Sequence, residues 1–262
     1  MDDSTVLVTR RENAVWLTIN RPEVHNALDA PTYNKMIDAV LAASAEDSVV
    51  AIVFTGAGER AFSAGGDINE QARRDTREGR RHVTRLLQLA HLVRTCGKTT
   101  IAAVNGYAFG AGNELHLLCD LTIASENAVF GENGTRVGTA PVWGATQLLP
   151  RVVGEKRARE IVLLGRSLTA QEACELGLVN KVVPPEALVA EVDDWCRQLG
   201  SKSPQALRIA KTSLNFESDL LQSSLTHGLE LMSLVYGNEE FREGVTAFLE
   251  KREPDYSSFW GS

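Results

Sequence analysis

The sequence predicts an α/β fold that continues into a helical C-terminal region, and three observations support this prediction. Short runs rich in β-branched residues recur through the first half of the chain. Helical patterns separate several of these runs, an alternation that is typical of α/β proteins. From about Glu155 onward the strand-like runs stop and helix signals take over.

The expected strands and helices alternate in the first 125 residues. The strand-like runs occupy residues 6–11, 14–20, 49–56, 99–106 and 120–125, and helical patterns occupy 31–46 and 80–96. In the second half, Thr169 and Glu172 have the spacing of a capping box at a helix start. A joint at 200–207 precedes two long helices, so the chain is expected to divide into a core (1–200) and a helical region (201–262).

Composition narrows the possible partners and the compartment. The chain has 262 residues and a formal net charge of -7, which gives no general attraction to nucleic acid or to a membrane surface. Its four cysteines form no CxxC pair and have no zinc-ligand spacing, as expected in a reducing compartment. The N-terminus lacks signal-peptide features and no run is apolar enough to span a bilayer, so we expect a cytoplasmic protein.

The stretch NGYAFGAGNELHLLCD, residues 105–120, places small residues directly before an expected helix. It is not a dinucleotide fingerprint, because Leu115 occupies the third glycine position after Gly110 and Gly112, and no GK[ST] follows. What remains is a helix N-terminus whose free N–H groups and dipole favour an anion. The alternative is that the glycines only permit close packing of helix and strand.

A second stretch, AFSAGGDI at residues 61–68, offers another flexible turn after an apolar strand. Two peptide N–H groups, one from each turn, are suited to hold one carbonyl oxygen and to stabilise it as an oxyanion when the carbonyl becomes an enolate. Such a site requires no metal, and we expect neither a metal nor an organic cofactor.

Five motifs, in this order and spacing, resemble the crotonase (enoyl-CoA hydratase/isomerase) superfamily. They are RPEVHNAL, AFSAGGDI, NGYAFGAGNEL, CDLTIAS and SLTAQEACELGLVNKVV, and the tail EGVTAFLEKREPDY fits as well. The resemblance implies a spiral of ββα repeats with a C-terminal helical region that forms homotrimers, often paired into hexamers. It also implies an acyl-CoA thioester substrate.

The same resemblance implies the site residues. The thioester oxygen is expected between the backbone amides of Gly66 and Ala111. Coenzyme A is expected to lie along His25, Ala27, Ala64, Asp67 and Ile68. For His25, an ordinary surface-loop histidine is an equally good interpretation.

Glu114 is the expected catalytic carboxylate, because it lies in the first turn of the oxyanion helix. Hydratases that resemble this chain use a second glutamate twenty residues later, and that position holds Gly134. Glu132 lies close by, but the flanking sequences leave no gap that would move it into this position. The sequence therefore predicts that the second carboxylate is missing. A helix-favouring carboxylate without a catalytic role remains the alternative for Glu114.

The loop GENGTRVG and the tail resemble dihydroxynaphthoyl-CoA synthase and 2-ketocyclohexanecarboxyl-CoA hydrolase. Those relatives use an aspartate, whose position here holds Pro141, and a tyrosine from a neighbouring subunit, whose position holds Tyr236. We expect an enoyl-CoA hydratase in which Glu114 moves the proton or orients water. Tyr236 is a candidate catalytic residue that would form the polar pair with Glu114 in C–C bond chemistry, and an ordinary interface aromatic is an equally good interpretation of it. The alternatives are a C–C bond lyase, hydrolase or synthase acting on a cyclic β-keto acyl-CoA, and a non-catalytic acyl-CoA- or RNA-binding protein.

Two further segments have more than one interpretation. The run 73–85 holds six arginines, which suit either a solvated helix face or the phosphates of coenzyme A. The C-terminal helices carry a helical stripe of leucines and a methionine that needs a partner surface within the chain or in another subunit. The stripe comprises Leu207, Leu214, Leu221, Leu225, Leu229 and Met232.

Overall fold

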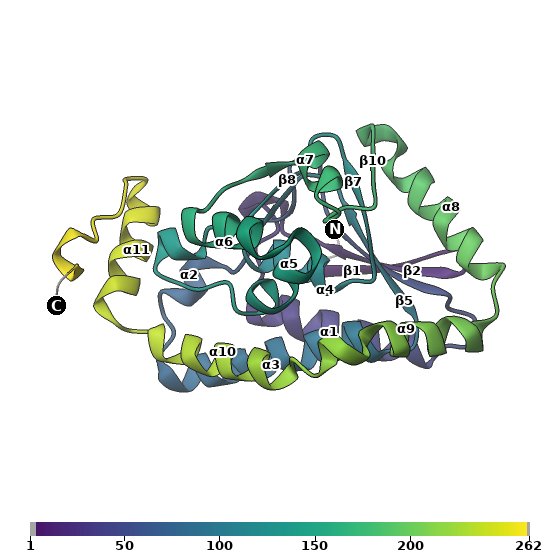
Figure 1. The fold of residues 1–262 in the computed structure, drawn as a ribbon, viewed down its shortest axis with the longest axis horizontal. Helices are drawn as coiled ribbons and strands as arrows, with labels where there is room; N and C mark the ends of the chain where they lie inside the picture. The colour runs from purple at the N-terminus through teal and green to yellow at the C-terminus, as the bar shows by residue number, and fades with distance from the viewer. Residues whose placement is uncertain (1–3, 261–262) are drawn as a thin grey trace.

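A six-stranded sheet forms the centre of the computed structural model, which describes residues 4–260 (Figure 1). Its strand order is β1 (Val6–Arg11), β2 (Ala14–Ile19), β3 (Ala51–Gly56), β5 (Thr99–Val104), β7 (Leu121–Ser125) and β10 (Lys181–Val183). β1 and β2 are antiparallel, whereas all the later neighbours pair in parallel. β3 and β5 are buried almost throughout, which explains why their sequences are continuously apolar.

A second, four-stranded sheet has the order β4 (Ala61–Ser63), β6 (Tyr107–Phe109), β8 (Val129–Gly131) and β9 (Leu168–Thr169). β4, β6 and β8 are parallel, and β9 is antiparallel to β8. β3 is followed directly by β4, β5 by β6, and β7 by β8. Each of these turns of the chain therefore adds one strand to each sheet. This winding confirms the predicted spiral of ββα repeats.

The helices enclose two apolar cores. The first half of the chain contributes α1 (Ala30–Ala45), α2 (Ile68–Gln71), α3 (Thr76–Thr95) and α4 (Ala111–Leu118); α5 (Ala145–Val153), α6 (Glu155–Leu164), α7 (Ala170–Glu175) and α8 (Leu188–Gly200) follow. The larger core lies between the sheets and α1, α3 and α4. The smaller core packs α8 against the other face of the large sheet, with Trp16, Val53 and Ile101.

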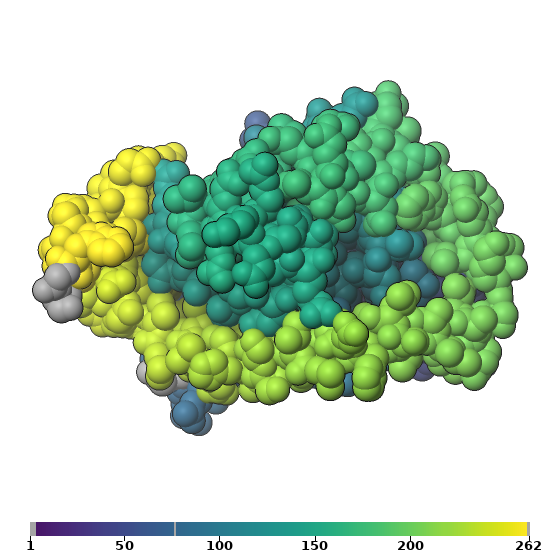
Figure 2. Space-filling model, in the orientation of Figure 1, coloured from purple at the N-terminus to yellow at the C-terminus, as the bar shows by residue number. Residues whose placement is uncertain are grey.

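Three C-terminal helices fold back over their own chain. They are α9 (Pro204–Asp219), α10 (Gln222–Val235) and α11 (Glu239–Glu250), and α10 packs along α3. Lys211 anchors α9, because its buried ammonium donates to the carbonyls of Val93 and Lys98 and pairs with Asp120 at 2.7 Å. Figure 2 shows α9 and α10 along one side of the molecule, with α11 and the tail at one end.

Most expected elements are present, with several corrections. The capping box of Thr169 and Glu172 is confirmed. The helix expected at 80–96 begins earlier, at Thr76, because Asp75 caps its N-terminus. The expectation that strands end near Glu155 is wrong, because β9 and β10 follow it in the chain. Both strands are too short to show an alternating pattern in the sequence. The expected pair of C-terminal helices is a set of three. No helix among the described residues has the length and apolarity to cross a membrane.

Candidate active site

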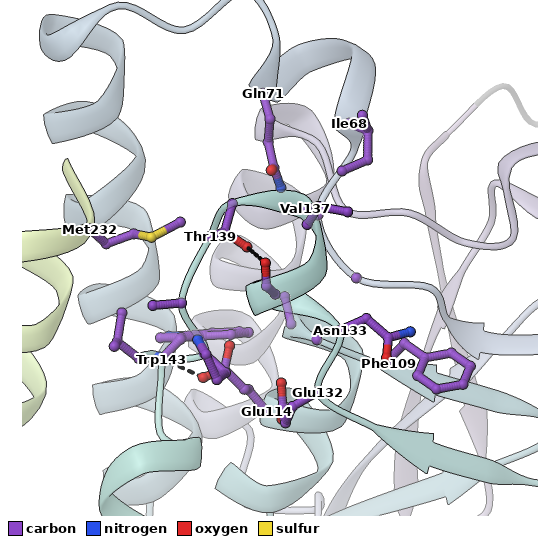
Figure 3. A pocket seen from close by; sticks show the side chains of 18 of the residues that line it. Ile68, Gln71, Phe109, Glu114, Glu132, Asn133, Val137, Thr139, Trp143 and Met232 are labelled. Atoms are coloured by element: carbon purple, nitrogen blue, oxygen red, sulfur yellow. Dashed lines mark hydrogen bonds between the residues drawn. The ribbon is translucent and has the colours of Figure 1, made fainter. Parts of the chain in front are cut away.

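A cavity of about 360 Å³ opens between the second sheet, α3, α10 and the loop that follows β8. The loop contains a 3₁₀ helix, η2 (Gly134–Val137). Tyr107 and Phe248 are among the lining residues and are half exposed, so they mark the entrance. Figure 3 shows the buried interior, where Glu114, Glu132 and Trp143 lie together. The cavity therefore contains carboxyl groups in its buried interior.

The glycines bring two turns into contact at this cavity. Gly65 and Gly110 have φ angles of 102° and 49°, which side chains disfavour. A Cβ on Gly112 would collide with the Ser63 carbonyl, and a Cβ on Gly65 would lie 3.4 Å from the Ala111 nitrogen. The glycine-rich stretch thus permits close packing, and this packing places the turn after β4 beside the start of α4.

Two backbone amides are free where these turns meet. Gly66 and Ala111 both line the cavity, and neither N–H donates a hydrogen bond to any residue that the structure describes. Ala111 is the first residue of α4, whose early N–H groups have no partner inside the helix. The two residues that the sequence indicated for oxyanion binding are therefore brought together.

Glu114 lies in the first turn of α4 and is buried. Its Oε1 accepts hydrogen bonds from the backbone N–H groups of Trp143, at 2.6 Å, and Ala145, at 3.3 Å. Desolvation raises the pKa of Glu114 to about 7, although these two hydrogen bonds oppose the change. Glu114 can therefore gain or lose a proton near neutral pH.

Glu132 provides a second carboxyl group, so the expectation that this group is missing is wrong. Its side chain is fully buried, lines the cavity and lies beside Glu114 (Figure 3). Desolvation and the charge of Glu114 raise the pKa of Glu132 well above its ordinary value. Gly134, at the expected position, contributes no side chain. Because β8 ends at Gly131, the chain turns at once and directs Glu132 inward.

A buried hydrogen-bond chain orients Glu132. Its Oε1 accepts from the Asn113 side-chain amide at 2.6 Å, and Asn113 Oδ1 lies 3.0 Å from His116 Nε2. His116 Nδ1 lies 3.3 Å from the Thr122 hydroxyl. Desolvation lowers the pKa of His116 to about 3, so the ring is neutral at physiological pH. Oε2 of Glu132 is buried and has no hydrogen-bond partner among the described residues.

Tyr236 also lines the cavity, from the end of α10. Its hydroxyl accepts a hydrogen bond from Arg74 at 3.1 Å, and Arg74 pairs with Glu70 at 2.6 Å. The resemblance implied a tyrosine from a neighbouring subunit, whereas this Tyr236 reaches the cavity of its own chain. Pro141 lines the same cavity and places no carboxylate there. Arg74 is buried, so the arginine run is not uniformly a solvated face.

The residues expected along coenzyme A fall into two groups. His25, Ala64 and Ile68 line the cavity, whereas Ala27 and Asp67 do not. The Asp67 side chain caps α2 and pairs with Arg21 at 2.9 Å. The Ala27 carbonyl accepts from Arg21 at 2.7 Å. Asp67 therefore stabilises the turn that carries Gly66.

The loop and the C-terminal tail together form one wall of the cavity. Val137 lines the cavity, and a Cβ on Gly244 of α11 would lie 2.6 Å from the Val137 carbonyl oxygen. A Cβ on Gly138 would lie 2.8 Å from the Cα of Phe241. The Tyr256 hydroxyl donates to the Arg136 carbonyl at 3.0 Å. Loop and tail are thus packed backbone to backbone.

Sequence reasoning missed three further buried polar residues of the cavity. They are Tyr33 on α1, Gln71 on α2 and His82 on α3. A signal existed for His82, since it shares the helical spacing of Leu86, Leu89 and Val93, all of which are buried. Tyr33 and Gln71 had no comparable signal, because a single aromatic or amide residue in a helix is unremarkable in sequence.

The spiral of paired strands and the turns that converge on a buried carboxyl pair define the class of this protein. A family model described as enoyl-CoA hydratase/isomerase matches residues 9–258, and the chain belongs to this family.

Solved structures of similar proteins agree with this assignment. An enoyl-CoA hydratase from Mycobacterium avium subsp. paratuberculosis K-10 is 30% identical, with a TM-score of 0.87 over 97% of this chain and 98% of that chain. One from Bacillus anthracis is 32% identical, with a TM-score of 0.78 over 96% and 98%. A third, from Bacillus halodurans, is 27% identical, with a TM-score of 0.86 over 93% and 100%.

Proposed function

We propose that this protein is a hydro-lyase that adds water to the double bond of an enoyl-CoA thioester. The observation that carries the proposal is the buried carboxyl pair, Glu114 and Glu132, in a cavity that also contains two free backbone amides. Burying two carboxyl groups side by side costs free energy, and groups that are perturbed in this way are typical of functional sites. The cytoplasmic location remains part of this proposal.

The amides of Gly66 and Ala111 would bind the thioester carbonyl oxygen. As water attacks the β-carbon, electrons move onto this oxygen and an enolate forms. Two N–H donors that are already in place stabilise this charge without reorganisation, and one such donor typically contributes about 2.7–4 kcal/mol. The α4 dipole adds to the effect, since Ala111 begins the helix.

The two carboxyl groups would have different roles because their environments differ. Glu114 is stabilised as a carboxylate by two backbone N–H groups, so it is the base that accepts a proton from water. Glu132 has one amide donor and faces the charge of Glu114, so it keeps its proton more firmly. It is therefore the acid.

The reaction balances with these roles. One O–H bond of water breaks, its proton moves to Glu114, and its oxygen bonds to the β-carbon. The proton of Glu132 moves to the α-carbon, where the enolate collapses to the thioester. Transfer of the proton from Glu114 back to Glu132 restores the starting state. The product is a 3-hydroxyacyl-CoA.

The test measures hydration of trans-2-butenoyl-CoA by the loss of its ultraviolet absorbance. We expect Glu114→Gln and Glu132→Gln each to lower kcat by about two to four orders of magnitude. Glutamine keeps the size of each side chain but cannot exchange the proton. Glu126→Gln, at an exposed site, is the matched control and should retain activity. Hydration by Glu132→Gln at the wild-type rate would refute its role as the acid.

A second candidate is a C–C bond lyase, hydrolase or synthase that acts on a cyclic β-keto acyl-CoA. The Tyr236 hydroxyl favours it, because it lines the cavity and is held by Arg74. Tyr236→Phe would then abolish turnover of a cyclic keto-acyl-CoA, whereas it should leave hydration of trans-2-butenoyl-CoA nearly unchanged. A non-catalytic acyl-CoA- or RNA-binding protein gives no account of the paired carboxyl groups.

We also propose a homotrimer, alone or paired into a hexamer. The predicted apolar stripe is divided in the structure, since Leu225 and Leu229 pack within the chain and Leu214 is exposed. Other large apolar side chains on the C-terminal helices are exposed as well: Ile209, Phe216, Leu220, Leu231 and Leu234. Exposed apolar side chains at this density are typical of subunit contacts.

A further inference from the structure

The cavity contains a group of polar atoms that lack protein partners. Among the described residues, six buried side-chain nitrogen or oxygen atoms have no hydrogen-bond partner. Four of the six belong to residues that line this one cavity: Tyr33, Gln71, His82 and Glu132. Buried polar groups normally have partners. Their concentration here indicates that a ligand supplies the missing ones.

Tyr33 and His82 form a pair that is distinct from the proposed reaction machinery. Their rings meet edge to face with centroids 5.3 Å apart, and Tyr33 makes a similar contact with Trp143 at 5.7 Å. Both are buried, at 0% and 5% exposure. The Trp143 backbone N–H donates to Glu114, and the Trp143 ring contacts the Tyr33 ring. Trp143 therefore connects Tyr33 to the carboxyl pair. On the proposed function, the acyl group of the substrate is therefore expected to extend toward Tyr33 and His82.

The pair is suited to an uncharged oxygen. A tyrosine hydroxyl both donates and accepts, and a neutral imidazole nitrogen does one or the other. Desolvation and the nearby Arg74 and Arg85 lower the pKa of His82 well below its ordinary value, so the ring is neutral. Arg74 is committed to Glu70 and Tyr236. The pair itself therefore carries no charge, which suits an uncharged ligand atom.

Much of the remaining cavity lining is apolar. Apolar lining residues of the same cavity include Leu86, Val142, Leu229 and Met232, together with Trp143, whose Nε1 donates to the Leu86 carbonyl. A plain alkyl chain would suit these residues but would leave the Tyr33 hydroxyl and His82 Nδ1 unpaired. One polar atom on an otherwise apolar acyl group satisfies both requirements.

We propose that Tyr33 and His82 bind an uncharged hydroxyl or carbonyl oxygen that the substrate carries on its acyl group beyond the β-carbon. This inference rests on the proposed function and narrows its substrate class to oxygenated acyl-CoA thioesters. In the absence of substrate, water can bridge the two groups, and the substrate oxygen replaces it.

The experiment compares matched ligands by calorimetry. Butanoyl-, hexanoyl- and octanoyl-CoA are each paired with the analogue that carries a terminal hydroxyl. At one chain length, the wild-type protein should bind the hydroxylated ligand about tenfold to a hundredfold more tightly, since burying an unpaired polar group is unfavourable. Tyr33→Phe should lose this preference and bind the plain acyl-CoA as before. His82→Phe, which keeps the ring contacts, should also lose it.

Tyr107→Phe is the matched control, because Tyr107 lines the cavity at its half-exposed entrance, and it should keep the preference. Equal affinity of the wild type for both ligands at all three lengths would overturn the inference. So would an equal loss of affinity for both ligands in Tyr33→Phe, which would indicate packing alone. If the preference is found but no enoyl-CoA is hydrated, the proposed reaction fails while this inference stands.

Discussion

Replacing Glu114 by glutamine should change how the stability of the protein depends on pH. The folded chain raises the pKa of Glu114 from 4.5 to about 7. Between pH 4.5 and about pH 7, the folded chain keeps the proton of Glu114 and the unfolded chain releases it. The free energy of unfolding must therefore fall as pH rises. Glutamine has no proton to lose, so this decrease should be absent from Glu114→Gln.

The magnitude follows from the same values. A pKa change of one unit corresponds to about 1.36 kcal/mol. For the change in pKa from 4.5 to about 7, the free energy of unfolding of the wild type should fall by about 3 kcal/mol relative to that of Glu114→Gln between about pH 4.5 and pH 8. Glu132 adds to the difference in the same direction, because its own pKa is raised by the charge of Glu114. His82 and His116 titrate in both proteins and largely cancel.

The assay is urea unfolding of wild type and variant at a fixed protomer concentration, from about pH 5 to pH 9. The quantity of interest is the difference between the two free energies of unfolding at each pH. Glu126→Gln is the control, because it makes the same substitution at an exposed position outside the cavity. If wild type and Glu114→Gln lose stability in parallel, the reasoning about desolvation at this site is refuted.

Two further predictions concern the oxyanion site and the assembly. Gly66→Pro should lower kcat by about two to three orders of magnitude, because proline has no N–H to donate. Gly66→Ala is the control, because it adds the same Cβ beside Gln71 but keeps the N–H. Equal activity of the two variants would contradict the proposed role of the Gly66 N–H as a donor. Sedimentation at micromolar concentration should give the mass of a trimer or hexamer, and a monomer would contradict the proposal that the exposed side chains of α9 and α10 form subunit contacts.

The repeating features of the fold were predictable from sequence. Buried parallel strands such as β3 and β5 produce continuous apolar runs, and the capping box at Thr169 is a local signal. Short strands such as β9 are formed by tertiary pairing and have no local pattern. The glycine turns were also visible, because Gly65 and Gly110 adopt conformations that favour glycine.

The site was predictable only where backbone geometry determines it. Gly66, Ala111 and Glu114 are fixed by turns and by the helix start, so their positions followed from the motifs. Glu132 was set aside because spacing alone cannot show where a chain turns after a strand end. Tyr33 and His82 come from two helices that pack together only in the folded chain. Their contact depends on tertiary structure and has no local signature.

The shared wall of loop and tail limits how this protein can be re-engineered. Residues 134–138 and 241–256 are more than a hundred positions apart in sequence, yet glycine on both sides lets their backbones touch. A chimera that imports only the loop from a relative would bring side chains against a tail shaped for another surface. Transplanting both segments together should preserve the wall, so for recombination purposes they behave as a single module.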